Sequence, residues 1–446
     1  MQNYFRNGTI VLTLALSACS LAPIYERPEM AVPGGWRAAP GMGVTTENTT
    51  AFWRELGSPE LNRLIDRTLE QNLDLEAALH RIDQARAQAK VAGAALFPAI
   101  NASGSTSRMY QDQTNEAARS GASISYEVDL WGKNRNQARS ARERAQASEF
   151  DREALRLVVT ADATNFYSQI LSLNDRIRIG EFNLRNAEEI LRIVEARFSQ
   201  GAVSGLEVSQ QRIAVNSLRT ALASLIEQRS ITANALAILL SLPPQDFSAP
   251  GSDLASLQTP HVNLTPPATL LTARPDIESA EAELRAANAD IGVARAAFFP
   301  SLTLGVDPSI AAGFGAPAAA ATSTVVNLIA PIFSGGRLTG NLENVTARQK
   351  ELAVQYHKTV LTAFQEVEDA LAGLKSANER AVIARASVFE SQNAYDIAKA
   401  RFDAGAIDYL NLLDAQRSLY QSQDSQIAIN QAQLQSFVQL RKALGA

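Results

Sequence analysis

The chain contains one segment twice. Residues 82–98 read IDQARAQAKVAGAALFP and residues 284–300 read LRAANADIGVARAAFFP, an offset of 202 (284 minus 82). Farther along, ARFSQGAV from Ala196 matches ARFDAGAI from Ala400 at an offset of 204 (400 minus 196), so the second copy has gained two residues. A repeat on this scale indicates that the fold consists of two copies of one structural unit.

A proline-rich connector separates the two copies. Residues 243–276 contain seven prolines, which interrupt regular secondary structure. We therefore divide the chain into a signal peptide, a lipidated N-terminal extended segment, a first repeat, the connector and a second repeat, at residues 1–18, 19–58, 59–242, 243–276 and 277–446.

Each copy is predicted to hold a helical stretch followed by two strands. In the first copy the helical pattern runs from about Pro59 to Leu96 and stops at Pro98. From residue 122 to residue 130, apolar residues alternate with small or polar ones, which is the period of a strand with one apolar face. We expect four strands per chain, at about 99–110, 119–130, 301–311 and 323–333.

A long helix follows each pair of strands. No proline occurs from Lys133 to Ser199, and apolar residues fall on alternating three- and four-residue steps, which is typical of a coiled-coil seam. A helix of this length extends about 100 Å at 1.5 Å per residue. Since no compact globule of this size needs such a helix, the pattern predicts an elongated helical hairpin.

The turns of these hairpins have their own residue chemistry. Gly201 suits the left-handed position after a helix, and Ser204 with Glu207 forms an S-x-x-E capping box that begins the next helix. Gly405 and Asp408 hold the matching places in the second copy. We predict hairpin tips at about 199–205 and 403–409.

The N-terminus indicates export and lipidation. The apolar run from Thr9 to Ser17 follows Arg6 and is too short to span a bilayer, which is typical of a secretory signal. It ends in Leu-Ser-Ala-Cys, which resembles a bacterial lipobox, and Cys19 is the only cysteine. An ordinary thiol is the alternative, but an unpaired thiol in an oxidising compartment invites unwanted disulfides. We therefore predict a diacylglycerol and an N-acyl lipid on Cys19, and no other cofactor. In the lipoproteins that this segment resembles, a serine such as Ser20 after the cysteine goes with sorting to the outer membrane.

Composition and motifs argue against two classes of function. The net charge is −5, without the basic excess of a nucleic-acid-binding protein. The three histidines, His80, His261 and His357, are isolated and lack metal-ligand spacing, and no GxSxG, HExxH or phosphate loop occurs. We therefore predict no catalytic site and no metal site. Beyond the signal, no apolar run reaches 18 residues, which excludes membrane helices but not membrane strands.

The number of strands bears on assembly. Four amphipathic strands do not close a barrel, and an open edge is not tolerated in hydrocarbon. Two chains give eight strands, whose interior is largely filled by side chains, whereas three chains give twelve strands and begin to leave a lumen. A trimer is the smallest assembly of this chain that conducts anything sizeable.

The chain resembles the TolC-type outer-membrane factor family, in its lipoprotein (NodT-like) branch that serves resistance-nodulation-division pumps. The resemblance extends from Cys19 to the C-terminus. The motifs that carry it are Ala22-Pro23 with Tyr25 and Arg27-Pro28, ARPDI from Ala273, AAFFPSL from Ala296, IFSGGR from Ile332 and YLNLLDAQRSLY from Tyr409.

The resemblance implies a trimer at the outer membrane, with a twelve-stranded β-barrel, a long α-helical barrel in the periplasm and an equatorial belt from the connector and chain ends. The trimer is expected to conduct exported small molecules from an inner-membrane pump and a periplasmic adaptor. Residues expected to face the adaptor are Arg197, Gly201, Ser204, Arg401 and Gly405. Those expected to form the pore gate are Leu410 and Asp414, with Asn411 and Asp408 as weaker candidates.

Simpler interpretations stand beside these roles. Asp414 suits a solvated helix face, and Arg197 and Arg401 suit the C-terminal end of a helix, where cations are favoured. For the whole chain, the alternatives are a structural coiled-coil lipoprotein of the cell envelope and a lipid-anchored periplasmic hydrolase. The predicted strands favour a duct over a coiled-coil tether, and the absence of catalytic motifs disfavours the hydrolase.

Overall fold

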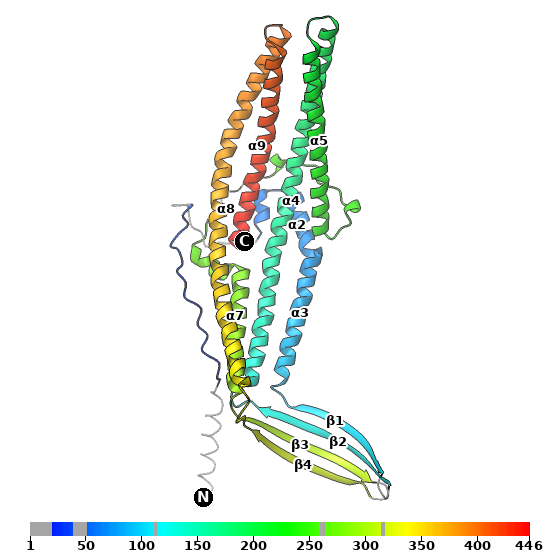
Figure 1. Ribbon diagram of the computed structural model, residues 1–446, viewed down its shortest axis with the longest axis vertical. Helices are drawn as coiled ribbons and strands as arrows, with labels where there is room; N and C mark the ends of the chain where they lie inside the picture. Colours follow the sequence, from blue (N-terminus) through cyan, green and yellow to red (C-terminus); the bar gives the residue numbers. More distant parts are fainter. Residues whose placement is uncertain (1–19, 39–50, 111–113, 259, 261–263, 314–316) are drawn as a thin grey trace. The chain divides into compact units, whose positions relative to one another are not determined.

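The computed structural model describes residues 20–38, 51–110, 114–258, 260, 264–313 and 317–446, which form long helices and one sheet (Figure 1). The predicted signal peptide, Cys19 and His261 lie outside these residues. Two compact units are present, and each takes residues from both sequence repeats. The first contains residues up to Met30, Ala78–Asp151 and Asp276–Thr359, and the second contains Ala31–Ala77, Arg152–Pro275 and Val360–Ala446.

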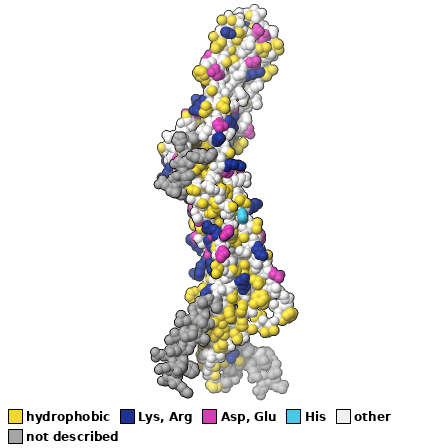
Figure 2. All heavy atoms as spheres, turned by 90° about the vertical axis from the view of Figure 1, so that its left-hand side faces the viewer, with side chains coloured by type: hydrophobic (Ala, Val, Ile, Leu, Met, Phe, Trp, Pro, Cys, Tyr) yellow, Lys and Arg dark blue, Asp and Glu magenta, His cyan; other side chains and the backbone are white. Residues whose placement is uncertain are grey.

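The first unit carries a four-stranded antiparallel sheet in the order β1-β2-β3-β4. Its middle pair joins the two repeats, because β2 of the first copy is hydrogen-bonded to β3 of the second, with Ile124 opposite Val306. Figure 2 shows hydrophobic side chains gathered toward the end of this unit that carries the strands. The four strands are Ala99–Tyr110, Thr114–Val128, Ser301–Gly313 and Ala319–Ile329.

The ends of β2 and β4 have clear local causes. After Val128 the chain turns, with the Leu130 amide donating to the Val128 carbonyl at 2.8 Å, so Leu130 does not continue the strand. β4 ends at Ile329, shortly before Pro331, which lacks the N–H that a strand ladder needs. This strand was predicted to reach residue 333, but it stops at Ile329, and Ile332 is exposed beyond the sheet.

The helices of the two repeats are equal in length. α3 (Leu73–Ala94) and α7 (Pro275–Ala296) each have 22 residues. α4 (Lys133–Ser199) and α8 (Arg337–Asp403) each have 67 residues, and α5 (Gly205–Leu239) and α9 (Tyr409–Ala443) each have 35. The prediction of two copies built on long helical hairpins and four strands is confirmed. Across the described ranges, no helix combines the length and apolarity needed to cross a membrane.

The first helical stretch is broken where a continuous helix was predicted. α2 (Pro59–Gln71) ends at Asn72, whose backbone is extended, and α3 begins at the next residue. The Asn72 side-chain oxygen accepts from the amides of Asp74 and Leu75 at 3.0 and 3.1 Å. Asn72 therefore caps α3, and this local hydrogen bonding competes with a continuous helix.

Aromatic residues form a core in the second unit. The short helix η1 (Phe52–Leu56) packs the Phe52 ring edge-on against Phe437 of α9, with ring centroids 6.4 Å apart. The nearly buried guanidinium of Arg441 pairs with Glu55 at 2.6 Å. Further short helices in this unit are η2 (Pro244–Asp246), η3 (Leu254–Ser256), η4 (Pro267–Thr269) and α6 (Leu270–Ala273).

The connector is tied to α4 within the second unit. The Asn174 amide donates to the carbonyls of Pro250 and Ser252 at 2.9 and 3.0 Å. The Leu254 amide donates to the Asp175 carboxylate at 3.0 Å. The proline-rich segment is therefore held against the helix by its backbone polar groups, which accounts for a long stretch with little regular structure.

Candidate functional site at the hairpin ends

The two hairpin turns share one backbone geometry. Gly201 and Gly405 both have φ of +73°, the left-handed conformation that favours glycine. In the first turn, the amides of Gly201 and Ala202 donate to the carbonyls of Phe198 and Arg197, both at 2.9 Å. The amides of the second turn, at positions 405 and 406, donate to the carbonyls at 402 and 401 in the same pattern. This pair of bonds is the Schellman motif, so both long helices end in the same way.

The helices that follow the turns begin differently. At the start of α5, the predicted capping box is present, with the Glu207 carboxylate accepting from the Ser204 amide at 3.0 Å. The hydrogen bond from the Ser204 hydroxyl holds the pKa of Glu207 below its usual value. Asp408 occupies the N-cap of α9, but its side chain accepts no capping hydrogen bond, and only its carbonyl accepts from the Asn411 amide, at 3.2 Å. At the start of α9, the second copy therefore has a backbone hydrogen bond where the first copy has a side-chain cap.

Arg197 connects the two hairpins. Its guanidinium lies 4.3 Å from the centre of the Phe402 ring and donates to the Phe402 carbonyl at 3.4 Å. Arg401, the matching residue of the second copy, is exposed, and its guanidinium makes no hydrogen bond or ion pair with any residue that the structure describes. The two arginines therefore have different roles, because Arg197 is committed to contacts inside the chain and Arg401 is available to a partner.

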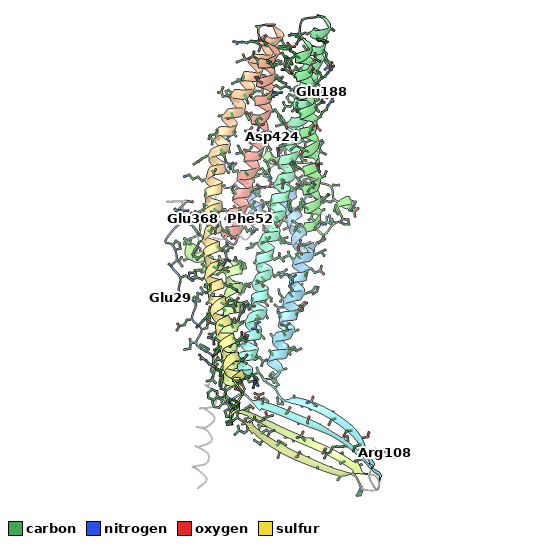
Figure 3. The ribbon with its side chains drawn as sticks, viewed as in Figure 1. Glu29, Phe52, Arg108, Glu188, Glu368 and Asp424 are labelled. Carbon is green, nitrogen blue, oxygen red and sulfur yellow. The ribbon has the colours of Figure 1, made fainter. Side chains whose placement is uncertain are left out.

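An apolar cluster fills the space between the hairpins near their ends. Phe402 and Tyr409 meet edge to face with ring centroids 6.2 Å apart. Exposed ion pairs between α4 and α5, including Arg219 with Glu188 at 2.7 Å, lie on the first hairpin (Figure 3). The buried members of the cluster are Ile190, Val194, Val208, Ala214, Tyr395, Phe402, Tyr409, Leu412, Leu413 and Leu419.

The four residues predicted for the gate are exposed. Leu410 is 50% exposed, and Asp408, Asn411 and Asp414 are exposed as well. Leu410 and Asp414 lie one helical turn apart, on the face of α9 that does not carry the buried Leu412 and Leu413. The cluster therefore leaves the side chains of the predicted gate free to meet another molecule.

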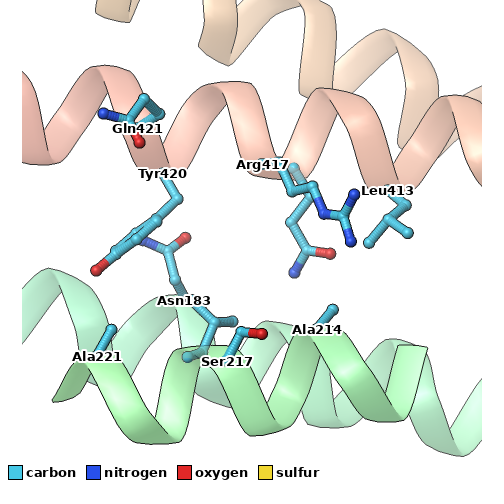
Figure 4. Close-up of a pocket in the computed structure, with 10 residues that line it drawn as sticks. Asn183, Ala214, Ser217, Ala221, Leu413, Arg417, Tyr420 and Gln421 are labelled. Atoms are coloured by element: carbon cyan, nitrogen blue, oxygen red, sulfur yellow. The ribbon is translucent and has the colours of Figure 1, made fainter. Parts of the chain in front are cut away.

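A cavity lies farther along the same helices. It has a volume of about 410 Å³, and Figure 4 shows Leu413 and Arg417 of α9 facing Ala214 and Ser217 of α5 across it. Gln416 also lines the cavity and is 6% exposed, and neither its amide nitrogen nor its amide oxygen is hydrogen-bonded to any of the described residues. The contact between α9 and α5 is therefore loosely packed at this level.

Comparison with known proteins identifies the family. A family model described as outer membrane efflux protein matches residues 64–241 and 267–446, so its two matches cover most of the chain and coincide with the two repeats. The chain belongs to the outer membrane efflux protein family. It is therefore the outer-membrane channel component of an efflux system, and the predicted family and location in the outer membrane are confirmed.

Individual relatives of this efflux channel cover nearly its whole length. The pyoverdine export outer membrane protein OpmQ of Pseudomonas aeruginosa is 38% identical over 97% of this chain and 94% of its own length. The toluene efflux pump outer membrane protein TtgC of Pseudomonas putida is 34% identical over 98% of this chain and 94% of its own. The solved outer-membrane channel OprN matches with a TM-score of 0.90 and 26% identity, over 96% of this chain and 99% of that one.

One contact at the hairpin ends of the efflux channel was not predicted. The Tyr409 hydroxyl donates to the side-chain oxygen of Gln211, and the Gln211 amide donates to the Ala187 carbonyl at 2.7 Å. Burial raises the pKa of Tyr409, so the hydroxyl stays protonated and available as a donor. This buried chain of hydrogen bonds joins α9 to α5 and α4. The only signal in the sequence was a tyrosine beside a helix start, which does not reveal a partner 198 residues away.

We expect Tyr409→Phe to loosen the hairpin ends. Removal of the hydroxyl leaves the buried Gln211 oxygen without a donor, which costs about 1–3 kcal/mol. Hydrogen exchange of the amides that begin α9 should therefore accelerate about tenfold. Tyr395→Phe is the matched control, since Tyr395 is buried in the same cluster but its hydroxyl has no hydrogen bond to the part of the chain that the structure describes. Equal exchange in the two variants would contradict this role.

Proposed function

We propose that three copies of this chain close a twelve-stranded barrel in the outer membrane and conduct exported small molecules passively. In this proposal the channel receives its cargo from a periplasmic adaptor and an inner-membrane pump of the resistance-nodulation-division type. The observation that carries the proposal is the open sheet. Within the described residues, the outer edges of β1 and β4 pair with no further strand.

An unpaired edge is costly in a membrane. Each strand edge exposes backbone N–H and C=O groups that hydrocarbon does not solvate. Val326 and Leu328 of β4 lie on the same face of the sheet as Ile100 of β1, and all three are largely exposed in the single chain, which suits a face that meets lipid. Pairing of β1 with β4 of the next copy satisfies the backbone groups, and three copies supply twelve strands, which begin to leave a lumen. The alternative of a structural coiled-coil lipoprotein gives these strands no role.

The exposed hairpin ends support contact with an adaptor. Arg401, Gly405, Gly201 and Ser204 are exposed at the turns, and Arg401 is an uncommitted cation among the described residues. Leu410 and Asp414, with Asn411 and Asp408 beside them, would recur three times around the pore in a trimer and so form its gate. We assign Arg197 a different role from the one predicted, that of fixing the first hairpin to the second through Phe402.

The chain is assigned no covalent step and no resident cofactor besides lipid. Within the described ranges no group of residues has the makings of a metal site, and His80 and His357 are exposed and isolated from each other in sequence. The names of the relatives mention pyoverdine and toluene, two chemically unlike molecules. This difference supports a passive duct whose cargo is chosen by the pump. We further propose that Cys19 bears the diacylglycerol and N-acyl lipid, to be tested by labelled palmitate in the native chain and in Cys19→Ala.

Two measurements test the duct. Light scattering of the full protein in detergent should give the mass of three chains, and a soluble monomeric rod would contradict a closed barrel. In cells, deletion of the gene should raise the accumulation of the pump's substrates, and the native gene should restore their export. Export that is unaffected by deletion, in a strain without another outer-membrane channel, would overturn the proposed function.

A further inference from the structure

The residues that follow Cys19 run in an extended conformation against the first unit. They lack regular secondary structure, yet their polar groups are paired one after another with α7 and with the first turns of α4. The ladder consists of the Ser20 hydroxyl with the Asn136 side chain at 3.2 Å, the Leu21 carbonyl with Arg295 at 3.3 Å and the Pro23 carbonyl with Asn288 at 2.8 Å. We call residues 20–27 the strap and the surface beneath it the groove.

A buried carboxylate holds the C-terminal part of the strap. Glu281 on α7 accepts two hydrogen bonds from the Arg27 guanidinium, at 3.0 and 2.5 Å, and one from the Tyr25 hydroxyl at 3.2 Å. The Glu281 side chain is 6% exposed, and Arg285 of the same helix lies 3.5 Å from it. A buried carboxylate is costly unless its oxygens are hydrogen-bonded. Since three of these contacts come from the strap, Glu281 needs the strap in place.

A glycine lets the strap approach the helix. Gly292 lies inside α7, where glycine destabilises a helix relative to alanine. A Cβ at this position would lie 2.7 Å from the Ala22 Cβ and 2.5 Å from the Asn136 side-chain nitrogen. Those separations are far below van der Waals contact, so any side chain at position 292 would push the strap out. The contacts of the strap therefore compensate for the cost of a glycine inside α7.

The two sequence repeats differ at the positions that hold the strap. At an offset of 202, α3 is the counterpart of α7, and the small or apolar residues are largely shared between the two. A single strap occupies only one of the two equivalent helices, so its contacts should be specific to one copy. In α7 the strap is held by Glu281, Asn288, Gly292 and Arg295, whereas α3 has Leu79, Arg86, Lys90 and Gly93 at those places.

We propose that the groove on α7 is a binding site for the chain's own N-terminal strap, and that it turns the lipid anchor from a flexible tether into a fixed one. The role of the lipid rests on the proposed function, whereas the docking of the strap does not. Ser20 is held at the first turn of α4, immediately after the chain leaves β2. Cys19 directly precedes Ser20 in the chain and consecutive Cα atoms are about 3.8 Å apart, so docking of Ser20 would keep a lipid on Cys19 from moving freely relative to this unit. In this proposal Ser20 has a structural role, separate from the sorting role that the lipoprotein resemblance implies.

Cleavage by a Glu-specific protease after Glu26 tests the docking, because a protease needs an undocked segment of several residues. In the full-length protein, Gly292→Leu should raise this cleavage rate on the order of tenfold or more. Gly340→Leu is the matched control, since Gly340 lies in α8 of the same unit with nothing within 4 Å of its Cβ position. This control should change the rate less than about twofold.

A second pair of variants guards against misfolding. Glu281→Gln keeps the shape of the side chain but weakens its bonds to Arg27, and it should also accelerate cleavage. Glu351→Gln is its control, since it alters only exposed contacts with Arg348 and Gln355 of the same helix. Cleavage as fast in the native chain as in Gly292→Leu would overturn the proposal, as would equal acceleration in the controls. Cys19→Ala should leave the cleavage rate unchanged. Failure of palmitate labelling would refute lipidation and leave the docking intact.

Discussion

Replacement of Leu410 by serine together with Asp414 by alanine should raise the single-channel conductance in planar bilayers several-fold. In the gate that we propose for the trimer, three copies of each side chain face one aperture, so smaller neutral residues widen it and remove three carboxylates. Cation preference should fall at the same time, because a ring of carboxylates favours cations. Both residues are exposed in the single chain, and their replacement therefore leaves the cluster between the hairpins unchanged.

The first repeat supplies a matched control for the gate. At the offset of 204, Leu206 and Gln210 occupy the places of Leu410 and Asp414, and Leu206 is exposed as well. Leu206→Ser with Gln210→Ala makes the same kind of change on the other hairpin and should leave conductance near the native value. Unchanged currents in the Leu410 and Asp414 variant, or an equal rise in the control, would place the constriction elsewhere.

Gly405→Val should abolish export while leaving trimers in the membrane. The backbone at this turn has φ of +73°, which costs an L-residue roughly 1–2 kcal/mol and a β-branched residue more. Nothing lies within 4 Å of the position that a Cβ would take, so the effect acts on the backbone of the turn and not on its neighbours. A rearranged turn displaces Arg401 and so disrupts the surface that we propose contacts the adaptor. Substrate accumulation in cells measures the loss.

A graded series separates the backbone effect from other causes. Asparagine tolerates the left-handed conformation better than valine, so Gly405→Asn should retain much of the export. Gly251→Val is the control, since Gly251 has open space around it and is not among the glycines with positive φ. Gly201→Val should behave like the matching change at Gly405. Normal export in the valine variants, with trimers present, would show that the turns do not contact the adaptor.

The sequence predicted the parts of the fold that repeat or that depend on neighbours in the chain. The duplicated segments predicted a helical hairpin in each repeat, and the Ser204 and Glu207 spacing predicted a cap that is present. The matching position in the second repeat, Asp408, differs: aspartate is a favoured N-cap residue, yet its side chain accepts no capping hydrogen bond at the start of α9. Sequence reasoning also missed the break at Asn72, because a competing cap inside an alanine-rich helical pattern gives only a weak signal.

Contacts between distant residues were beyond sequence reasoning. Arg197 was expected to face a partner, yet it stacks on Phe402, more than two hundred residues away in the chain. The groove for the strap was missed because its residues are spaced irregularly along α7 and are meaningful only with Ala22 and Arg27 in place. A comparison of the two repeats at Gly292 would have flagged it, since a glycine there replaces Lys90 inside a helix.

The equal helix lengths of the two repeats constrain how this protein changes during evolution. α4 and α8 have 67 residues each, and α5 and α9 have 35 each, so the two hairpins form a matched pair. Insertion of seven residues lengthens one helix by about 10 Å, or two turns. Such an insertion in one repeat would make its hairpin longer than the other, so the two turns would no longer lie at the same height. Homologues adapted to a wider or narrower periplasm should therefore carry insertions or deletions of matching length in all four helices, α4, α5, α8 and α9, at once.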